Sequence, residues 1–433
     1  MANGLRRIAC IGGTLALLSW YAPAPAAAAR GPADATGPAM RAADVPPVSQ
    51  RNLRDVLAAL RSARYRFIPL PVIATDPAEG QTYGALPVLI ALDDREEILG
   101  IFAAAGTYNT VVGFGGFATW MLTPSAREEL RLFGGGSQRF YREGSVDYFN
   151  HRGLDGRLQG QTHFLYITDP FERFFGFGPG APKAAESNFT SQWFRGWGEL
   201  NYAFRPRLAA VLQMDWAKLR IDPRALQNLL DTATAYGALP EVTGAHHLIY
   251  RAGCRWESRD NQFFPTRGVQ AQFLGIASHA VTGPAQPFGG YEARVKFAWQ
   301  PHARFTTVGN GRWQQLFGAR IPFALQSSLG GEKELRGFVA RRFTDRHAVS
   351  LDLEERILVK EWHFMGTDVA FSIDPFFSVG QVFRGGDDLR LRNVEPAGGV
   401  GFRMRAMPSV LGRVDVGYSR DGFAVYTTLD YPF

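Results

Sequence analysis

Along most of the chain after residue 66, apolar and polar residues alternate with a period of two. The apolar members of five such runs are Leu208, Ala210, Leu212, Met214 and Trp216; Leu248, Tyr250, Ala252, Cys254 and Trp256; Tyr291, Ala293, Val295, Phe297 and Trp299; Val400, Phe402 and Met404; and Val414, Val416 and Tyr418. The positions between them are often charged, as at Asp215, Arg251, Glu292, Arg403 and Asp415. Because the side chains of a strand alternate between its two faces, this pattern predicts strands with one apolar and one charged face.

The segment before this region has a helical period instead. The apolar residues at the spacing of one helix face are Leu53, Val56, Leu57 and Leu60. Ser49 stands where a helix N-cap is expected, so we predict one helix over residues 49–65. Residues 30–48 are rich in Ala, Pro and Gly, which predicts a flexible linker before the helix.

Strands with such faces occur in soluble sandwiches and in transmembrane barrels. Sandwich strands are usually about 5–6 residues long. A strand that crosses a membrane needs about 9–11 residues, apolar outward and polar inward. The longer runs in this chain reach about that second length, and a charged face over so many strands fits a water-filled lumen. The pattern therefore predicts an all-β fold, an antiparallel transmembrane β-barrel.

The number of strands follows from counting the alternating runs. About 17 strand candidates lie between Phe67 and Phe433. Single-chain bacterial barrels have an even number of strands, so the weak candidate at residues 130–140 is left out. The prediction is a barrel of 16 strands.

The first 29 residues have the three parts of a secretory signal peptide. Arg6 and Arg7 precede an apolar core at residues 8–20, and four alanines at residues 26–29 offer cleavage sites. Beyond this segment no run of 18 apolar residues occurs, so no transmembrane helix is expected. The chain is thus divided into a signal peptide (1–29), a periplasmic linker with a short helix (30–65) and an outer-membrane β-barrel (66–433).

The last predicted strand ends the chain on an aromatic residue. One face of this strand has Phe423, Val425, Leu429, Tyr431 and Phe433, with Thr427 as the exception. The ending Leu429, Tyr431 and Phe433 resembles the C-terminal signature of bacterial outer-membrane proteins, which the barrel assembly machinery reads. The resemblance implies a location in the bacterial outer membrane, with that machinery and the outer-membrane lipids as partners.

Composition and charge exclude several other classes. Lys and Arg number 47 against 40 Asp and Glu, and they are spread along the chain, so nucleic acid is not an expected partner. Aromatic residues make up 13% of the chain, which excludes a disordered protein. Only Cys254 remains after cleavage of the signal peptide, so no intrachain disulfide is expected.

Residues with catalytic or metal-binding chemistry are sparse in the sequence. His246 and His247 are adjacent, and we interpret them as a loop pair, because neighbours on a strand face opposite ways. No nucleotide-binding glycine motif leads into a convincing helix. We therefore expect neither an enzyme nor a cofactor or metal site.

Five motifs resemble those of the BamA/TamA-type bacterial surface antigen family. The motifs, in chain order, are DPAEG at 76–80, FFGFG at 174–178, DNQFFPTRG at 260–268, LGGEKELRGF at 329–338 followed by Arg341, Arg342 and Asp345, and LDLEER at 351–356. Together they run through nearly the whole predicted barrel. The resemblance implies a function in inserting or translocating proteins, or lipids, at the outer membrane.

Two features of the chain depart from this family. Family members carry POTRA modules before the barrel, but residues 30–65 are too few for one, so capture of a substrate would need a separate periplasmic partner. A passive, porin-like channel that keeps only the fold is therefore the alternative function. In addition, the segment DPFFSVG at 374–380 has Ser378 where the family has an Asp that pairs with the loop arginine.

The resemblance also implies a site, which we call the lumen latch: Arg336, Gly337, Glu354, Asp374 and Ser378. Arg336 and Gly337 belong to a loop that is expected to fold back into the barrel. An unpaired Arg in a confined site is unfavourable, so a carboxylate other than position 378 should pair with Arg336. Glu354 is the first choice because it follows the loop closely on a lumen-facing position, and Asp374 is the second. Glu355 then falls on the lipid-facing side.

Overall fold

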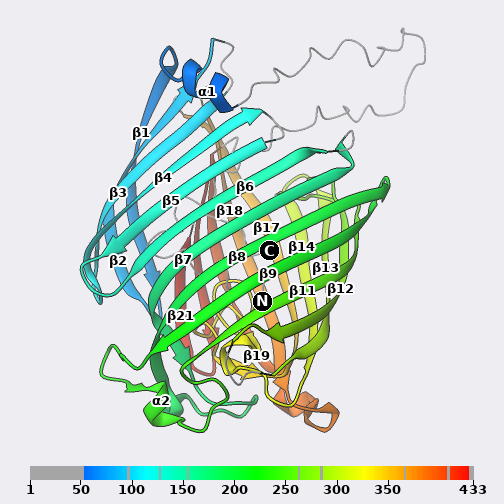
Figure 1. Ribbon diagram of the computed structural model, residues 1–433. Coiled ribbons are helices and arrows are strands. Elements are labelled where there is room, and N and C mark those ends of the chain that lie inside the picture. The colour runs from blue at the N-terminus through cyan, green and yellow to red at the C-terminus, as the bar shows by residue number, and fades with distance from the viewer. Residues whose placement is uncertain are drawn as a thin grey trace.

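The computed structural model describes residues 53–94, 98–125, 128–153, 156–261, 264–282, 286–364, 367–406 and 410–428. These residues form one antiparallel, nearly closed barrel of about 18 strands (Figure 1). The predicted signal peptide, the linker and the terminal residues Leu429, Tyr431 and Phe433 lie outside the described residues. In the described part, no helix is long and apolar enough to span a membrane.

Each barrel strand pairs with its neighbours in chain order (Figure 1). The barrel strands are β1 (Arg64–Asp76), β2 (Gly80–Leu92), β3 (Ile98–Asn109), β4 (Gly113–Ser125), β5 (Glu128–Ser137), β6 (Arg142–Gly153), β7 (Leu158–Phe174), β8 (Ser187–Arg205), β9 (Leu208–Asp222), β11 (Gly244–Glu257), β12 (Gly268–Ala280), β13 (Phe288–His302), β14 (Phe305–Phe317), β17 (His347–Phe364), β18 (Thr367–Phe383), β19 (Glu395–Ala406), β20 (Val410–Ser419) and β21 (Gly422–Thr428).

The predicted fold class is confirmed, but the predicted strand number of 16 is wrong. The candidate at 130–140, left out to reach an even number, is the real strand β5, which pairs with both β4 and β6. Its Gly134–Gly135–Gly136 run weakens the apolar pattern without preventing pairing. The barrel therefore reaches an even number of strands by having more strands than predicted, not fewer.

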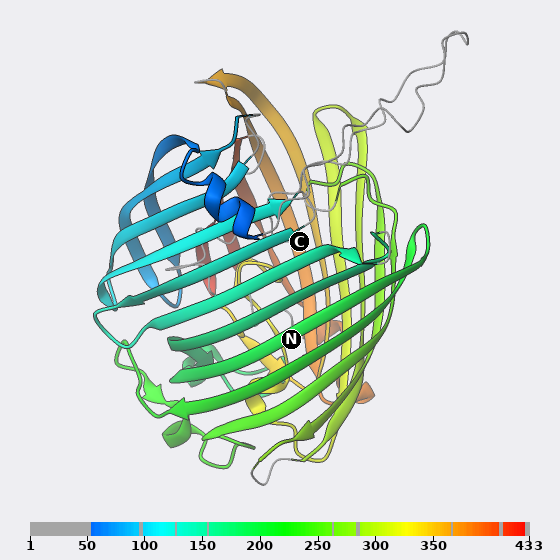
Figure 2. The same ribbon diagram turned by 45° about the horizontal axis from the view of Figure 1, so that its top comes forward.

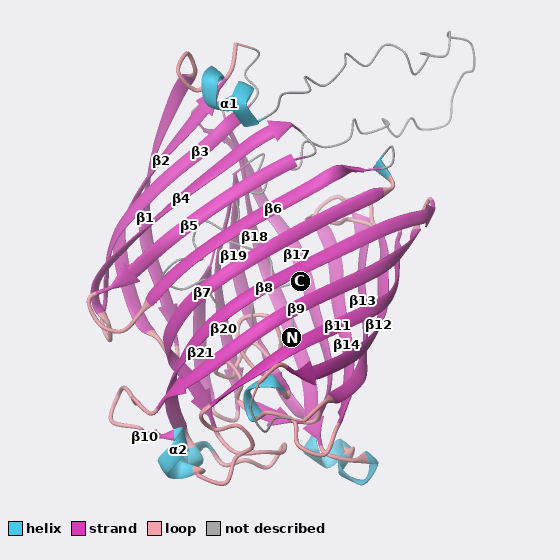
Figure 3. Ribbon diagram, in the orientation of Figure 1, coloured by secondary structure: helices cyan, strands magenta, loops and turns pink. Residues whose placement is uncertain are grey.

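The two ends of the barrel differ (Figures 1 and 3). At one end the strands are joined by short turns, such as residues 206–207 and 303–304, and helix α1 (Leu53–Ala59) lies there. Helix α1 covers part of the predicted helix 49–65, and its Val56 packs against Ala91, Leu99 and Leu122. At the other end lie longer loops, which contain β10 (Leu230–Asp231), α2 (Thr232–Ala235) and the short 3-10 helices η5 (Lys183–Ala185), η7 (Gly386–Asp388) and η8 (Leu391–Asn393).

The longest of these connections, residues 318–346 between β14 and β17, turns back into the barrel (Figure 2). It contains η6 (Phe323–Leu325) and a small separate sheet of β15 (Ser327–Leu329) and β16 (Phe343–Asp345). Its apolar residues form a buried cluster with the barrel wall, made of Leu329, Leu335, Phe338, Phe343, Ala348, Val382 and Ala397. We call residues 318–346 the lumen loop.

The outer face of the barrel is apolar and carries aromatic side chains near both ends. On β8, Phe194 and Phe204 are both exposed and point outward. They are ten residues apart, about 33 Å along the strand, which becomes about 25 Å across a membrane when the strand tilts by about 40°. That span matches the apolar band of an outer-membrane barrel.

Candidate functional site

The lumen loop is shaped by residues that adopt unusual backbone angles. Gly330 and Gly331 have φ of 107° and 110°, a region open mainly to glycine, and they turn the chain after β15. Leu335 also has a positive φ, 54°, directly before the tip residue Arg336. The amide of Leu335 donates a hydrogen bond of 3.3 Å to Asp352 on β17, which holds this bend against the wall.

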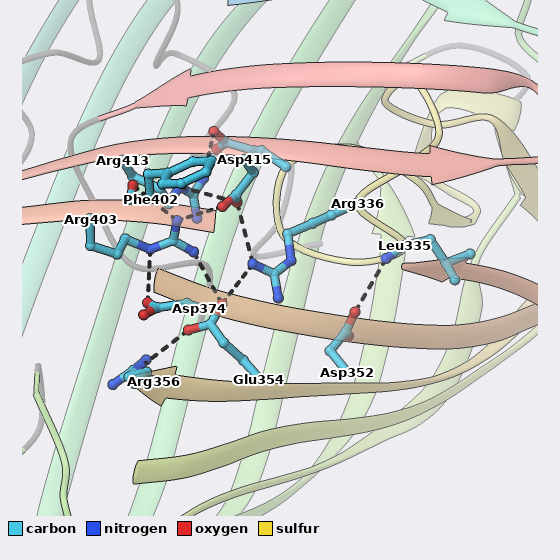
Figure 4. Close-up of polar contacts among 11 residues, drawn as sticks. Leu335, Arg336, Asp352, Glu354, Arg356, Asp374, Phe402, Arg403, Arg413 and Asp415 are labelled. Atoms are coloured by element: carbon cyan, nitrogen blue, oxygen red, sulfur yellow. Dashed lines mark hydrogen bonds and ion pairs between the residues drawn. The ribbon is translucent and has the colours of Figure 1, made fainter. Parts of the chain in front are cut away.

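The Arg336 side chain is fully buried in the lumen (Figure 4). Its Nη1 lies 2.7 Å from Oε2 of Glu354 on β17 and 3.3 Å from Oδ2 of Asp415 on β20. The guanidinium also stacks on the ring of Phe376, 3.8 Å from the ring centroid. A charged side chain from one connection thus bridges two strands that are far apart in sequence.

Further arginines of the wall hold the same carboxylates (Figure 4). Arg403 on β19 contacts Asp415 at 2.5 Å and Glu354 at 3.1 Å, and Arg356 contacts Glu354 at 3.1 Å. Arg413 lies 3.6 Å from Asp415. A buried charge is tolerated only when it is paired, and here each carboxylate meets more than one guanidinium. We call Arg336, Glu354, Arg356, Asp374, Arg403, Arg413 and Asp415 the lock cluster.

The expected contact between Arg336 and Glu354 is present. The second choice, Asp374, contacts a different arginine. Asp374 lies 3.4 Å from Nε of Arg403 and so joins the cluster indirectly. Ser378 is buried and faces Asp352 across the pair β17–β18; none of the described contacts joins it to Arg336. Glu355 points outward as expected and accepts a hydrogen bond of 2.6 Å from Thr307.

The tip of the lumen loop is charged on both sides. Glu334, two residues before Arg336, lies 2.8 Å from Arg312 on β14 and 3.7 Å from Arg294 on β13. The wall is therefore basic where the tip is acidic and acidic where the tip is basic. This complementarity fixes the orientation of the tip, because a reversed tip would place like charges together.

Glycines in β19 and β20 let the tip lie directly on the wall. A Cβ atom added to Gly417 would lie only 1.6 Å from the carbonyl oxygen of Arg336 and 3.0 Å from Cα of Gly337. Only a glycine therefore fits at position 417. Gly399, which pairs with Gly417, leaves room for the ring of Phe376. The hydroxyl of Ser419 donates a 2.7 Å hydrogen bond to the carbonyl of Gly337.

The returning part of the lumen loop is tied to two other connections, the β7–β8 loop and the β20–β21 turn. Thr344 forms a bridge with Phe177, and its carbonyl accepts a 3.0 Å hydrogen bond from the amide of Gly178. The buried Arg342 pairs with Asp421 at 2.5 Å. The FFGFG motif of the sequence therefore contacts the loop that carries the LRGF motif.

The other two motifs form turns at the ends of the barrel. In DNQFFPTRG the Asp260 carboxylate accepts hydrogen bonds from the amides of Thr266 and Arg267, at 2.9 and 3.2 Å. Partial burial alone would raise the pKa of Asp260, but the hydrogen bonds, above all that from Thr266, bring it below its usual value. In DPAEG the Asp76 carboxylate accepts a 2.7 Å hydrogen bond from the amide of Ala78.

The barrel has a seam between its first and last strands. β1 and β21 are neighbours, yet no backbone ladder joins them within the described residues. Pro69 lies opposite Pro87 in the β1–β2 ladder. Pro87 has no partner in the β2–β3 ladder, so the side of Pro87 that lacks an N–H group faces β3. By the alternation of an antiparallel ladder, the missing N–H groups of Pro69 and Pro71 are on the seam side of β1.

The structure also corrects the interpretation of the paired histidines. His246 and His247 lie inside strand β11, not in a loop, and they face opposite sides of the sheet. The described residues contain no group of three or more side chains that could hold a metal ion.

Sequence reasoning missed several members of the lock cluster. Asp415, Arg403 and Arg413 were visible as charged positions between apolar ones, but strand periodicity gives only the face on which a residue lies. Their approach to Arg336 depends on where the lumen loop crosses the barrel. A usable signal was the density of glycine in GGVG at 398–401, which marks a close approach of the backbone to another segment.

The barrel is similar to solved outer-membrane structures. BamA from Haemophilus ducreyi lacking POTRA domains 1–3 matches with 13% identity and a TM-score of 0.50, over 86% of this chain and 76% of that one. CdiB from Escherichia coli matches with 12% identity and a TM-score of 0.46, over 87% and 69%. OccK10 (OpdN) from Pseudomonas aeruginosa matches with 10% identity and a TM-score of 0.39, over 85% and 98%.

The match to BamA shows the fold: the chain is an outer-membrane-type β-barrel similar in structure to that protein. At 13% identity the likeness does not extend to the function. No protein-family model matches the chain, and no curated protein matches it.

Proposed function

We propose that the chain is a bacterial outer-membrane barrel that assists the insertion or translocation of proteins, or lipids, and that the lumen loop keeps it closed at rest. In this proposal the short turns and α1 are on the periplasmic side and the long loops are outside, as is usual for such barrels. It has no catalytic cycle and no cofactor. A periplasmic partner that binds residues 30–65 delivers the substrate to the barrel.

The observation that carries this proposal is the lumen loop held by the buried contacts of Arg336 with Glu354 and Asp415, at 2.7 and 3.3 Å. A passive channel needs an open lumen, whereas here a loop with its own apolar cluster and ion pairs fills part of it. The seam supports the same proposal, because the described residues of β1 and β21 share no ladder, and strands without ladder hydrogen bonds separate at a lower cost than strands with them.

The test is an insertion assay with a loop that can be fixed reversibly. Phe177 and Thr344 are bridge partners, so Phe177→Cys with Thr344→Cys, in a Cys254→Ser background, should form a disulfide between the lumen loop and the β7–β8 loop. Each protein is reconstituted into liposomes, and folding of an added unfolded outer-membrane barrel is followed by its heat-modifiable migration.

We expect the oxidised pair to slow folding of the added barrel, and a reductant to restore the rate of the Cys254→Ser parent. The single variant Thr344→Cys is the control and should behave like the parent under both conditions. An assay in which the parent itself gives no acceleration over empty liposomes would contradict the proposed function. Equal rates of the oxidised and reduced pair would contradict a moving loop.

A further inference from the structure

The outer face of β9 and β11 carries basic side chains directly beyond the apolar outward positions of β9. Lys218 and Arg220 are exposed and have the same outward direction as Trp216, and His246 lies opposite Lys218 in the β9–β11 ladder. Neither Lys218 nor Arg220 has an ion-pair partner among the described residues. We call Lys218, Arg220 and His246 the outer basic cluster.

The register of the strands places this cluster at the edge of the apolar band. Lys218 pairs with Phe194, the exposed aromatic residue of β8 near the long-loop end. Arg220 is the next outward residue of β9 towards that end. Below them on β9 the outward residues are Leu212, Met214 and Trp216. A charged residue facing lipid is tolerated only near the headgroups, so the cluster marks the headgroup level on this side of the barrel.

One carboxylate follows the cluster on the same face of β9, and it has a closer cation of its own. This carboxylate, Asp222, interacts electrostatically with Arg220 but forms its ion pair with Arg224, at 2.7 Å. His246 is held by a 3.0 Å hydrogen bond between its Nδ1 and the hydroxyl of Thr282, and its ring packs edge-on against Trp216. Arg142 on β6 lies in the same register row as Arg220, through Thr168 and Gln192, about 14 Å away.

From this arrangement we infer that the outer basic cluster binds the phosphate groups of an anionic lipid headgroup in the outer leaflet, which in a bacterial outer membrane is a phosphorylated glycolipid. Lys218 and Arg220 supply the charge, and the guanidinium fork can hold two phosphate oxygens at once. The acyl chains lie against the apolar strip of β9 below them. The inference rests on the orientation given under the proposed function, but not on insertion activity.

The hairpin β8–β9 offers a matched control for testing this site. Its other end carries two exposed arginines, Arg205 and Arg207, at the short-turn end of the barrel. The test variant is Lys218→Gln with Arg220→Gln, and the control is Arg205→Gln with Arg207→Gln. Both remove two positive charges from the same pair of strands, and heat-modifiable migration checks that each variant is folded.

Binding of a bisphosphorylated lipid A to the detergent-solubilised full chain is measured by native mass spectrometry, with zwitterionic phosphatidylethanolamine, which has no net charge, as the comparison. We expect the test variant to raise the dissociation constant for lipid A about tenfold, the control to leave it unchanged, and excess inorganic phosphate not to compete. Equal affinities of the test variant and the wild type would overturn the inference. So would loss of binding in the control alone, or full competition by inorganic phosphate, which would indicate a free-anion site.

Discussion

The inner wall of the barrel differs between its first four strands and strands β13–β20. In β1–β4 the buried side chains carry no charge: most form one apolar cluster, namely Val72, Leu86, Val88, Ile101, Ala103, Ala105, Phe117 and Met121, and a few are uncharged polar residues such as Thr82 and Asn109. In β13–β20 they include Arg312, Asp352, Glu354, Arg403, Arg413 and Asp415. Cross-strand partners share one face, so the pairing of Met121 with the buried Arg131 on β5 places the apolar set on the same face as the buried charge of the next strand.

This difference teaches how each half of the barrel is held together. In the first half the strands pack through apolar contacts that depend on shape. Their outer face is apolar as well, with exposed side chains such as Phe102 and Trp120. In the second half, specific pairing of charges positions the lumen loop. Apolar contacts tolerate small shifts, whereas a buried ion pair strongly favours one arrangement over the others.

The largest expected effect is that of Arg336→Met, which keeps much of the side-chain volume but removes the charge. Glu354 and Asp415 then lose one of their cations in a buried site. We expect the free energy of unfolding to fall by about 3 kcal/mol, as for other broken buried pairs. Urea unfolding in detergent, followed by tryptophan fluorescence, measures this. A loss below about 1 kcal/mol would mean that the cluster holds without Arg336.

A substitution in the apolar half sharpens the comparison. Leu86→Ala removes a buried side chain from the β1–β4 wall and should lower the free energy of unfolding by about 2–3 kcal/mol through the lost contacts and the cavity. Channel conductance should stay at the wild-type value, because this wall does not touch the lock cluster. A rise in conductance above the wild-type value would remove the distinction between the two halves.

A smaller effect is expected from Gly417→Ala, which tests how closely the tip lies on the wall. The new Cβ would overlap the carbonyl oxygen of Arg336, so the tip must move, at a cost of about 1–2 kcal/mol. The control is Gly134→Ala on β5, where a Cβ meets nothing within 4 Å. If both variants unfold at the same urea concentration, the tip does not rest on Gly417.

The smallest effect on stability, under about 1 kcal/mol, is expected from Pro69→Ala with Pro71→Ala. These changes return two N–H groups to the seam side of β1, so hydrogen exchange of residues 64–76 should slow. The control Pro87→Ala returns a donor towards β3 and should leave that exchange unchanged. Unchanged exchange in the double variant would show that the prolines do not keep the seam open.

The same difference explains which features the sequence could predict. Strands with a charged lumen face, such as β9, β11 and β13, show a clear period of two. β2 and β3 do not, because residues such as Val88 and Leu89 are apolar on opposite faces. The glycine run made β5 a weak candidate, and that strand was left out of the predicted number. Strand number was therefore underestimated, although the barrel itself was predictable.

For the site, the sequence could predict a pair but not a cluster. Glu354 lies 18 positions after Arg336 and on the lumen face, so local reasoning found it. Asp415 is 79 positions away, and its contact depends on the path of the loop across the lumen. Ser378 could be excluded as a charged partner from its chemistry alone. The sequence could not predict that Asp374 would contact Arg403 and not Arg336.

The central claim is that the pairing of Arg336 with Glu354 keeps the lumen loop in place and the barrel closed. The most direct test is the single-channel conductance of Glu354→Gln in planar bilayers, beside wild type and Glu199→Gln. Glu199 is another buried lumen carboxylate, bound to Asn201 and Arg255 and not to the loop. The account predicts larger and more frequent openings for Glu354→Gln, and wild-type behaviour for Glu199→Gln. Identical conductance of all three proteins would contradict it.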